Sequence, residues 1–335
     1  MESRLCYLLR RLVAFTFRRI YMPPPYKHMT ISIPMGISRI IINAKTANIV
    51  QNCAIFAAVK KLTDIIPSIA AELAQFEAFF EKTVHAETEP MNSIMQYVLD
   101  SRGKRMRPIL VLLSAKLFGE VNEQTLRAAT FVEMVHSATL IHDDVVDDSN
   151  LRRNHASVKA CFGNLSAVLA GDYLLAKAML LLAQPNDYAI LQEMLHTTAA
   201  MSEGELMQGS VGLSYHGSRS DAPQQWLPLY DNPTDQYIDI VTRKTSMLMR
   251  SCCVSGALSV NASPEQVQLI ADFGLNFGIL FQLRDDQLDS ENMELAKALL
   301  PEYLNKTMAS LQSFPDSETL DALCELTVFC AEREE

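Results

Sequence analysis

The chain has 335 residues and a formal net charge of -10, with 49% hydrophobic and 20% charged residues. This is an ordinary globular composition, and its negative balance argues against nonspecific nucleic-acid binding, so a phosphate group must be held by local cations or by a metal. Only 12 glycines are present, and alternating β-branched runs are scarce after residue 60. The composition therefore predicts an all-α protein with a large core.

The first 60 residues differ from the rest of the chain in composition. They are rich in arginine and lysine, contain Glu2 as their acidic residue, and are interrupted by three consecutive prolines at 23–25. Such a segment is typical of an organellar transit peptide or of contact with a membrane surface, and a poorly structured extension fits it equally well. We expect residues 1–60 to be a basic extension and residues 61–335 to form one domain, cytoplasmic unless the extension is a transit peptide.

From residue 61, apolar side chains recur at spacings of three and four, a pattern that predicts a succession of long helices. The expected helices cover residues 61–80, 94–99, 109–118, 125–142, 167–183, 190–207, 234–258, 264–283, 291–311 and 317–333. The intervening stretch at 209–233 is rich in glycine, serine and proline and predicts a long loop. No uninterrupted apolar run approaches membrane-spanning length. The seven cysteines lack metal-binding spacing and are expected to be reduced, buried thiols.

The pattern Asp-Asp-x-x-Asp occurs twice, at residues 143–147 and 285–289. Each copy follows an apolar run with helical spacing, so each should lie on the last turns of a long helix with its first and last carboxylates about 6 Å apart on one face. A lone acidic run is usually a solvated loop, but two copies at one spacing disfavour that interpretation. The helix dipole opposes negative charge at a C-terminus, so a cation is expected, and Mg²⁺ shared with substrate phosphates is the natural candidate. The carboxylates concerned are Asp143, Asp144, Asp147, Asp285, Asp286 and Asp289.

Basic residues lie at three places along the predicted helices. Residues 103–108 carry three cations at a positive helix N-terminus, which outlines an anion site, although a solvated basic turn fits as well. Arg152 and Arg153 follow the first acidic cluster and either pair with its carboxylates or clamp a phosphate ester together with metal. Residues 243–245 offer a further phosphate contact. His136 precedes the first cluster by seven residues on the same helical face, where a lone histidine is more often a core residue than a ligand.

Taken in chain order, these motifs resemble those of the trans-prenyl diphosphate synthases, or polyprenyl synthetases, of the long-chain type such as octaprenyl and solanesyl diphosphate synthase. The resemblance extends from about residue 61 to the end and rests on an ordered set of segments at residues 103–108, 133–148, 169–178, 202–206, 243–245 and 281–289. It implies an all-α bundle of antiparallel helices of the isoprenoid synthase type around a deep apolar cavity. It also implies Mg²⁺ as cofactor, isopentenyl diphosphate and an allylic diphosphate as substrates, and a homodimer.

The resemblance also assigns roles to individual positions of this chain. It implies that magnesium is bound by Asp143, Asp147, Asp285 and Asp289, with Asp144 and Asp286 beside them. Isopentenyl diphosphate would be held by Lys104, Arg105, Arg107, His136 and Arg153. The allylic substrate would be contacted by Arg152, Lys244, Thr245 and Gln282. In this chemistry, metal and cations neutralise the departing diphosphate so that the allylic C–O bond ionises, and apolar walls protect the carbocation from water.

The length of the product is expected to depend on the helix that precedes the first acidic cluster. In the family fold the growing chain runs beside this helix, and the residues one turn before Asp143 are Ala138 and Thr139 rather than aromatic residues. The cavity should therefore stay open past a short product. The candidate stops deeper in the cavity are Val135, Met134 and Phe131. We expect a long-chain polyprenyl diphosphate, such as a quinone side-chain precursor, and membrane-surface contact through this lipophilic product or the basic N-terminus.

Three features depart from the family pattern. Asp289 is followed almost directly by the expected helix at 291–311, where the family has a further block with a diphosphate-contacting lysine and part of a lid. Asn154 and Ala156 replace a glycine and a small-residue or proline pattern, and the loop at 209–233 is longer than usual. Because of the missing block, a catalytically impaired homologue serving as a structural or regulatory subunit of a prenyltransferase dimer is kept as the alternative function.

Two further activities are disfavoured by the residues themselves. A metal phosphohydrolase that uses His142 and Asp143 with His136 and His155 would need histidines near the second acidic cluster, and none follows residue 216. A terpene cyclase of this ancestry usually has an Asn/Ser/Glu-type metal motif where the second Asp-Asp-x-x-Asp stands. The prenyl chain elongase is therefore the preferred interpretation.

Overall fold

The computed structural model describes residues 65–101, 103–152, 155–212, 232–289 and 292–333, together with Leu62 and Tyr230. The basic extension at residues 1–60, most of the loop expected at 209–233 and Arg153 lie outside the described residues. The domain boundary expected at residue 60 therefore stays a prediction.

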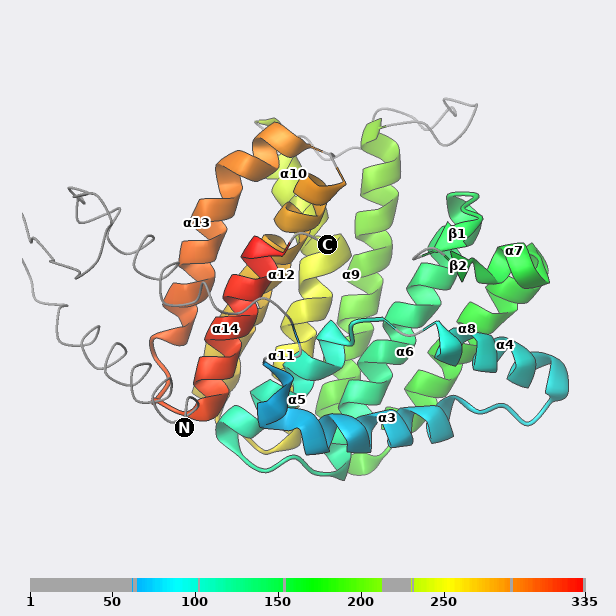
Figure 1. Cartoon of the computed structure of the whole chain (residues 1–335), viewed down its shortest axis with the longest axis horizontal. Coiled ribbons are helices and arrows are strands. Elements are labelled where there is room, and N and C mark those ends of the chain that lie inside the picture. Colours follow the sequence, from blue (N-terminus) through cyan, green and yellow to red (C-terminus); the bar gives the residue numbers. More distant parts are fainter. Residues whose placement is uncertain are drawn as a thin grey trace, which may run out of the picture. The chain divides into compact units, whose positions relative to one another are not determined.

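The described chain is almost entirely helical, which confirms the all-α fold (Figure 1). Its helices are, in chain order, η2 (Ile66–Ile69), α3 (Ala70–Val84), α4 (Glu89–Asp100), α5 (Met106–Phe118), α6 (Glu123–Val146), α7 (Val158–Phe162), α8 (Asn164–Leu182), η3 (Pro185–Asp187), α9 (Tyr188–Gly212), α10 (Pro233–Val241), η5 (Thr242–Ser246), α11 (Met247–Ser259), α12 (Pro264–Leu288), α13 (Met293–Leu311) and α14 (Glu318–Glu332). The strands of the described residues are β1 (Leu151–Arg152) and β2 (His155–Ala156), which pair as a short antiparallel hairpin.

The two helices that end in the acidic clusters both begin with a capping box. In α6 the Asn122 side chain accepts a hydrogen bond from the Thr125 N–H, and the Thr125 hydroxyl accepts one from the Asn122 N–H. Ser263 and Gln266 form the same reciprocal pair at the start of α12, where Pro264 occupies the first turn as predicted. Because these caps satisfy backbone donors that a helix start leaves unpaired, both helices begin at defined residues.

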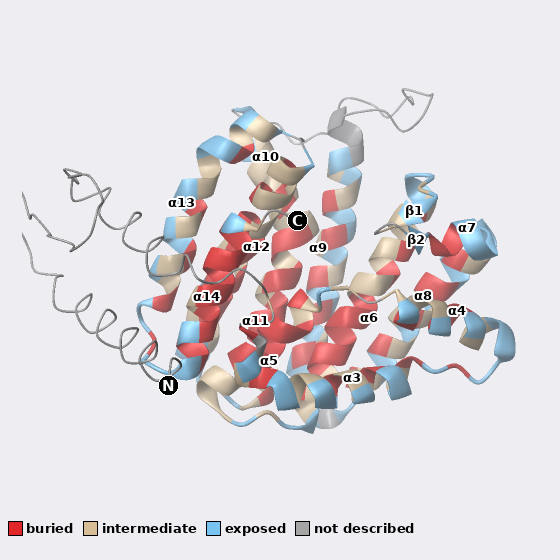
Figure 2. Ribbon diagram, in the orientation of Figure 1, coloured by how far each residue is buried: buried red, intermediate tan, exposed pale blue. Residues whose placement is uncertain are grey.

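The core lies where α6, α11 and α12 pack against their neighbours (Figure 2). α11 contacts α5, α9 and α12, and most of its residues are buried. Phe131 of α6 and Phe273 and Phe277 of α12 are among the largest fully buried side chains. Burial of one such side chain contributes about 1.5–3 kcal/mol relative to its exposure. The helices that carry the acidic clusters are therefore anchored in the core.

Three local features differ from the helices expected from the sequence. The segment after the first cluster contains the β1–β2 hairpin and α7, where a loop was expected. The helix expected at 234–258 is divided by η5, a π-helical turn between α10 and α11. α9 continues to Gly212 into the stretch expected to be a loop. Each difference is a local adjustment within a chain that is otherwise helical where helices were predicted.

The second acidic cluster is followed directly by the last two helices, as the sequence indicates. α12 ends at Leu288 and α13 begins at Met293, so no other helix lies between them. α13 and α14 pack on α12 and on each other. The C-terminal helix is thereby brought close to the end of α12.

One described helix, α8, is mostly apolar, although Asp172 and Lys177 prevent an uninterrupted apolar run. α8 is long and apolar enough to cross a membrane by length and composition alone. In the structure it packs against α6 and α7, and 33% of its most apolar stretch of 18 residues is buried. Several of its apolar side chains are exposed, including Leu165, Leu169 and Leu180.

The described cysteines are free thiols. Cys252, Cys253 and Cys330 are buried as expected, and burial raises the pKa of the Cys253 and Cys330 thiols to about 12. Such thiols are unreactive at neutral pH. Cys161 is exposed, so the prediction that the cysteines are buried is wrong for this residue.

Candidate active site

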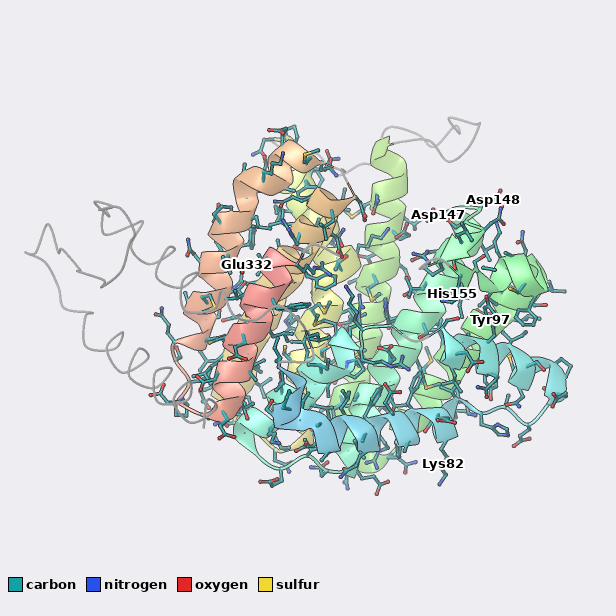
Figure 3. All side chains as sticks on the ribbon, viewed as in Figure 1. Lys82, Tyr97, Asp147, Asp148, His155 and Glu332 are labelled. Atoms are coloured by element: carbon teal, nitrogen blue, oxygen red, sulfur yellow. The ribbon has the colours of Figure 1, made fainter. Side chains whose placement is uncertain are left out.

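The first acidic cluster lies at the end of α6, as the sequence predicts. Asp147 is the C-cap residue, and its N–H donates to the Asp143 carbonyl oxygen at 2.8 Å. Asp147 and Asp148 are both exposed at this end of the helix (Figure 3). Asp148 has a φ of 53° and pairs with the buried Lys159 of α7. The helix therefore stops inside the cluster and presents its last carboxylates to solvent.

Asp143 is partly buried beside charges from two other helices. Burial raises its pKa to about 6, and the negative charges of Glu205 and Asp147 act in the same direction, while the cations Lys244 and Arg152 oppose them. Lys244 Nζ is itself paired with Glu205 Oε2 at 2.6 Å. Negative charge therefore exceeds positive charge around Asp143, an imbalance that a bound cation would relieve.

Arg152 is paired with the first acidic cluster. Its Nε and Nη2 atoms both donate to Asp144 Oδ1, at 2.9 and 2.6 Å. Asp144 is buried, and Arg152 lies on β1 directly opposite His155 on β2. Of the two roles that the sequence left open for Arg152, the structure contains the pairing with a carboxylate, and its contact with a substrate stays a prediction.

The second acidic cluster lies at the end of α12, again as predicted. The Asp289 N–H donates to the Asp285 carbonyl oxygen at 2.8 Å, which repeats the geometry at the end of α6. Asp286 is buried and accepts hydrogen bonds from Tyr237 Oη at 2.5 Å and Gln282 Nε2 at 2.7 Å. Gln282 Oε1 accepts in turn from Thr245 Oγ1 at 2.9 Å. Thr245 and Gln282, both predicted to contact the allylic substrate, thus belong to one hydrogen-bonded chain that ends on this cluster.

Asp285 is covered by the end of α14. Arg333 Nη2 pairs with Asp285 Oδ1 at 2.5 Å, its guanidinium lies 4.1 Å from the centre of the Phe281 ring, and its side chain is 7% exposed. Arg284 of α12 donates to the Arg333 carbonyl oxygen at 2.8 and 2.5 Å. Burial still raises the pKa of Asp285, while Arg333 and Arg107 oppose this effect.

The basic residues at the start of α5 point in different directions. α5 begins at Met106 rather than at residue 109, and Arg105 adopts the left-handed conformation with a φ of 53°. Arg105 pairs with Glu77 of α3 at 2.9 Å and with Glu133 of α6 at 2.6 Å, so it fastens this loop to two helices. Arg107 Nη1 lies 2.9 Å from His136 Nε2, while Lys104 is exposed. The predicted contacts of these residues with isopentenyl diphosphate stay predictions.

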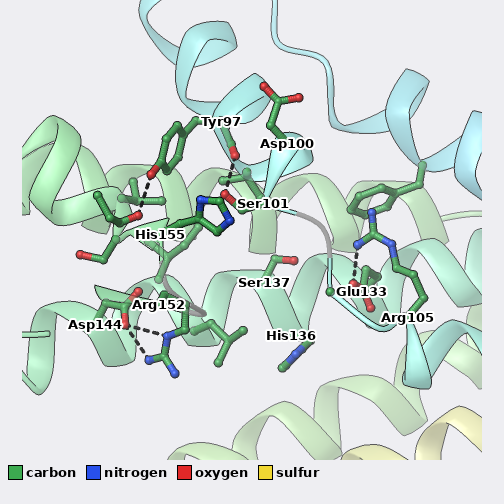
Figure 4. Close-up of a pocket in the computed structure, with 18 residues that line it drawn as sticks. Tyr97, Asp100, Ser101, Arg105, Glu133, His136, Ser137, Asp144, Arg152 and His155 are labelled. Atoms are coloured by element: carbon green, nitrogen blue, oxygen red, sulfur yellow. Dashed lines mark hydrogen bonds and ion pairs between the residues drawn. The ribbon is translucent and has the colours of Figure 1, made fainter. Parts of the chain in front are cut away.

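A cavity of about 210 Å³ lies between α4, the basic loop, α6 and the β1–β2 hairpin (Figure 4). Its lining includes four predicted site residues: Arg105, His136, Asp144 and Arg152. Tyr97 and His155 also line it, and Tyr97 Oη donates to the Ala156 carbonyl oxygen at 2.6 Å, which ties the hairpin to α4. The cavity therefore brings two of the predicted isopentenyl diphosphate residues, Arg105 and His136, next to the first acidic cluster.

The carboxylates at the two helix ends fit magnesium chemically. Among the described residues, no three carboxylate, imidazole or thiol groups are gathered closely enough to hold one metal ion together. Magnesium usually takes only one or two protein carboxylates and completes its shell with substrate phosphates and water, so a larger protein cluster is not required. Burial, and after it the negative charges of Glu205 and Asp147, raise the pKa of Asp143 and so favour a cation at the end of α6.

The residues predicted to limit product length are mostly deep in the core. Ala138, Val135, Met134 and Phe131 are buried, and Thr139 is partly exposed. Phe131, Val135 and Ala138 lie on the helical face that also carries His142, whose Nε2 lies 3.2 Å from the Val168 carbonyl oxygen of α8. This face is directed toward α8, and its role as the floor of a product cavity stays a prediction.

Sequence reasoning missed three residues that touch the predicted site. Glu205 pairs with Lys244, Tyr237 donates to Asp286, and Arg333 pairs with Asp285. Only Glu205 lies in one of the family-like motifs, the segment at 202–206. The other two lie 49 and 48 residues from their partners, a separation at which no sequence pattern indicates contact.

The motifs, the helical fold and the arrangement of the site agree with a family assignment. The family model for Polyprenyl synthetase matches residues 88–298, and the chain belongs to this family. Among solved structures, a polyprenyl synthase from Caulobacter crescentus, complexed with calcium and isoprenyl diphosphate, matches with a TM-score of 0.71 at 24% identity, covering 83% of this chain and 99% of that one. This similarity shows the fold.

Two curated relatives illustrate the similarity in sequence. The all-trans-nonaprenyl-diphosphate synthase (geranyl-diphosphate specific) of Rhodobacter capsulatus is 34% identical over 227 residues, which cover 68% of this chain and 65% of that protein. Heptaprenyl diphosphate synthase component 2 of Geobacillus stearothermophilus is 32% identical, covering 70% of this chain and 68% of that protein. The chain thus spans about two thirds of the length of these relatives.

Proposed function

We propose that this chain is a magnesium-dependent trans-prenyltransferase that condenses isopentenyl diphosphate with an allylic diphosphate to form a long-chain polyprenyl diphosphate. The observation that carries the proposal is the alternation of carboxylates and cations between the ends of α6 and α12. Arg107 contacts His136 of α6 and acts electrostatically on Asp285 of α12. Lys244 acts on Asp143, and the adjacent Thr245 is linked through Gln282 to the second cluster. Two diphosphates would each meet cations here.

The two diphosphates are assigned to different sides of the site. Lys104, Arg107, His136 and Arg153 would hold the diphosphate of isopentenyl diphosphate and so orient its double bond. Arg152, Lys244, Thr245 and Gln282 would contact the allylic diphosphate. Fixed cations lower the barrier to ionisation because they stabilise the charge that develops on the departing diphosphate. Arg105 supports this arrangement by fastening the basic loop to Glu77 and Glu133.

The condensation itself requires few protein groups. The allylic C–O bond breaks with its electron pair leaving on the diphosphate, and the double bond of isopentenyl diphosphate forms the new C–C bond. A proton is then lost, and the released pyrophosphate is its natural acceptor. When bound, Mg²⁺ held by Asp143, Asp147, Asp285 and Asp289 would neutralise the leaving group. Buried apolar residues of the surrounding helices would exclude water that could otherwise trap the carbocation.

The assay uses the purified full chain with Mg²⁺, radiolabelled isopentenyl diphosphate and farnesyl diphosphate. We expect chain-extended products that separate by reverse-phase chromatography. A variant in which Asp143→Asn and Asp285→Asn are combined serves as the inactive control. If no product forms with any of three primers, farnesyl, geranyl and geranylgeranyl diphosphate, the proposed function is rejected.

A long-chain product is supported by the small residue at 138, one turn before the first cluster. Ala138→Phe should shorten the product if this residue borders the product cavity. If Ala138 instead packs against α8, the larger ring would overfill the contact and cost about 1–3 kcal/mol of stability without a change in product length. Product length and melting temperature measured on the same variant separate these outcomes.

We further propose that the chain functions as a homodimer through the outer faces of α8 and α9. The exposed apolar side chains there include Leu165, Leu169 and Leu180 of α8 and Leu195 and Leu206 of α9. Contiguous apolar patches larger than a few hundred Å² are uncommon on monomeric proteins and mark interaction surfaces. Light scattering should give twice the mass of one chain, and combining Leu165→Lys with Leu180→Glu should yield a monomer. A wild-type monomer at micromolar concentration would contradict the assignment.

A further inference from the structure

The π-helical turn η5 carries the two residues assigned to the allylic diphosphate on this side of the site, Lys244 and Thr245. The Met247 N–H at its end donates to the Thr242 carbonyl oxygen, the five-residue spacing that defines a π-helix. The wider turn rotates the following side chains relative to a regular helix. Where Lys244 and Thr245 point therefore depends on how this turn is held.

Two glycines, one on α9 and one on α12, lie against the backbone of this turn. A Cβ atom added at Gly204 of α9 would lie 2.7 Å from the Lys244 backbone nitrogen and 2.8 Å from Arg243 Cβ. A Cβ atom added at Gly278 of α12 would lie 2.5 Å from Ser246 Cα. These distances are too short for any real contact, so a side chain at either position would displace the turn. α9 and α12 can thus approach the backbone of η5 only because both positions lack a side chain.

The residues on either side of Gly204 bind the two cations of the turn. Arg243 Nη1 pairs with Glu203 Oε2, and Lys244 Nζ pairs with Glu205 Oε2, each at 2.6 Å. Two consecutive cations thus meet two carboxylates that are two positions apart on one helix. Both ion pairs flank the close contact between Gly204 and η5. Glu203, Gly204 and Glu205 therefore all act on this one short turn.

The turn is also the point at which the two acidic clusters are connected. On one side Lys244 acts electrostatically on Asp143 of the first cluster. On the other side the Thr245 hydroxyl donates to Gln282, which donates to Asp286 of the second cluster. A small shift of η5 would therefore change the surroundings of both clusters at once.

We propose that the Glu203-Gly204-Glu205 segment of α9 is a positioning element that fixes the register of η5, so that Lys244 and Thr245 face the allylic diphosphate. Gly204 permits the close contact with η5 because it has no side chain. Glu205 orients Lys244 by pairing with it. This inference rests on the proposed function, because it assigns the segment to one of the two substrates. The role of this segment thus differs from that of the basic loop at 103–105, which is assigned to isopentenyl diphosphate.

The first experiment measures the KM of each substrate for Gly204→Ala. Because displacements near 1 Å can cost up to about 100-fold in catalysis, we expect the KM for farnesyl diphosphate to rise by about 10-fold or more, with less than about a 2-fold change for isopentenyl diphosphate. Gly256→Ala is the matched control, because its added Cβ would lie 2.3 Å from the Val111 carbonyl oxygen at the contact of α11 with α5. The control should lower the melting temperature without separating the two KM values. Equal changes in both KM values for Gly204→Ala would overturn the inference.

The second experiment asks whether Glu205 acts through Lys244. Glu205→Gln, Lys244→Gln and the double variant are compared by the calorimetric affinity for farnesyl thiolodiphosphate, which cannot ionise readily, in the presence of Mg²⁺. Residues that act as one unit are not additive, so the double variant should bind no more weakly than Lys244→Gln alone. Additive losses, or a weaker affinity for Mg²⁺ alone in Glu205→Gln, would show that Glu205 acts independently and would overturn its assigned role.

The wild-type chain distinguishes failure of this inference from failure of the proposed function. If the wild type neither extends farnesyl diphosphate nor binds the thiolodiphosphate, the proposed function is wrong and the positioning role is overturned with it. If the wild type does both and Gly204→Ala and Glu205→Gln match it, the positioning role alone is wrong.

Discussion

The two acidic clusters have the same sequence pattern and the same helix-end geometry, yet their surroundings differ. At the end of α6, Asp147 is exposed and Asp143 faces the negative charge of Glu205. At the end of α12, Arg333 pairs with Asp285, while Tyr237 and Gln282 donate to Asp286. The pattern therefore fixes where the carboxylates lie, but residues distant in the chain determine how far their charge is already compensated.

This difference predicts unequal roles in metal binding. Burial and a neighbouring carboxylate both disfavour the ionised form of Asp143, so a bound cation gains most at the first cluster. At the second cluster an arginine already occupies part of the space around Asp285. Magnesium should thus bind first at the end of α6, and binding at the end of α12 should compete with Arg333.

The largest effect is expected from Asp143→Asn, which removes a carboxylate whose ionised form is disfavoured by burial and by the charge of Glu205. Loss of one group that stabilises the departing diphosphate typically costs about 100- to 1000-fold in kcat, and we expect a loss in this range. Asp272→Asn, an exposed residue earlier on α12, serves as the control and should leave kcat unchanged. Turnover within 3-fold of wild type for Asp143→Asn, an allowance of about 0.7 kcal/mol, would remove the distinction between the clusters.

Arg333→Met tests the shielding of the second cluster. Without magnesium it leaves Asp285 unpaired, and we expect a loss of about 2 kcal/mol in the free energy of unfolding, below the usual cost of breaking a buried pair because Asp285 is partly exposed. Magnesium should restore more stability to this variant than to wild type. Lys297→Met, which breaks an exposed pair with Glu294, should have little effect. Equal responses of both proteins to magnesium in thermal melts would argue against competition by Arg333.

The pH dependence of stability tests the first cluster. Burial raises the pKa of Asp143 from 3.8 to about 6, so the folded protein holds this proton more tightly than the unfolded chain. The resulting stabilisation is complete below pH 3.8 and is lost as the pH rises through 6, by about 1–2 kcal/mol after allowing for partial exposure. Magnesium competes with the proton, so its stabilising effect should grow over the same interval. Melting curves from pH 4 to 8 should show both trends in wild type, and both should be weaker in Asp143→Asn, which retains Asp285 with its raised pKa.

The smallest effect is expected from Tyr237→Phe, which removes one hydrogen bond to Asp286. We expect a cost of about 1 kcal/mol and a weaker magnesium affinity at the second cluster. Tyr230→Phe is the matched control, since Tyr230 Oη donates to Asp239 Oδ2 at 2.5 Å on α10. The control should lose stability without a change in magnesium affinity. Identical magnesium titrations for the two variants would show that Tyr237 does not support the cluster.

Much of the fold was predictable because helical periodicity and capping residues are local signals. Pro264, Ser263 and Gln266 mark the start of α12, and the Asp-Asp-x-x-Asp pattern correctly indicated its end. The π-helical turn was not predictable, since one inserted residue barely alters the spacing of apolar side chains. The hairpin at 151–156 has too few residues to give an alternating pattern.

The sequence predicted which residue types form the site, but it did not predict which side chains form ion pairs with each other. Glu77 and Glu133, the partners of Arg105, are each 28 residues away, and Arg333 lies 48 residues from Asp285. Such contacts arise from the packing of α3, α6, α12 and α14 and leave no trace in local spacing. The resemblance to a family predicted roles for Arg105 and Asp285, and the structure supplied their neighbours.

The clamp between Arg284 and the Arg333 carbonyl oxygen has a practical consequence for handling the protein. It anchors the last described turn next to the end of α12. A variant that ends at Glu332 would lack both this anchor and the partner of Asp285. It should therefore differ from the longer chain in its magnesium requirement, although the two cores are identical.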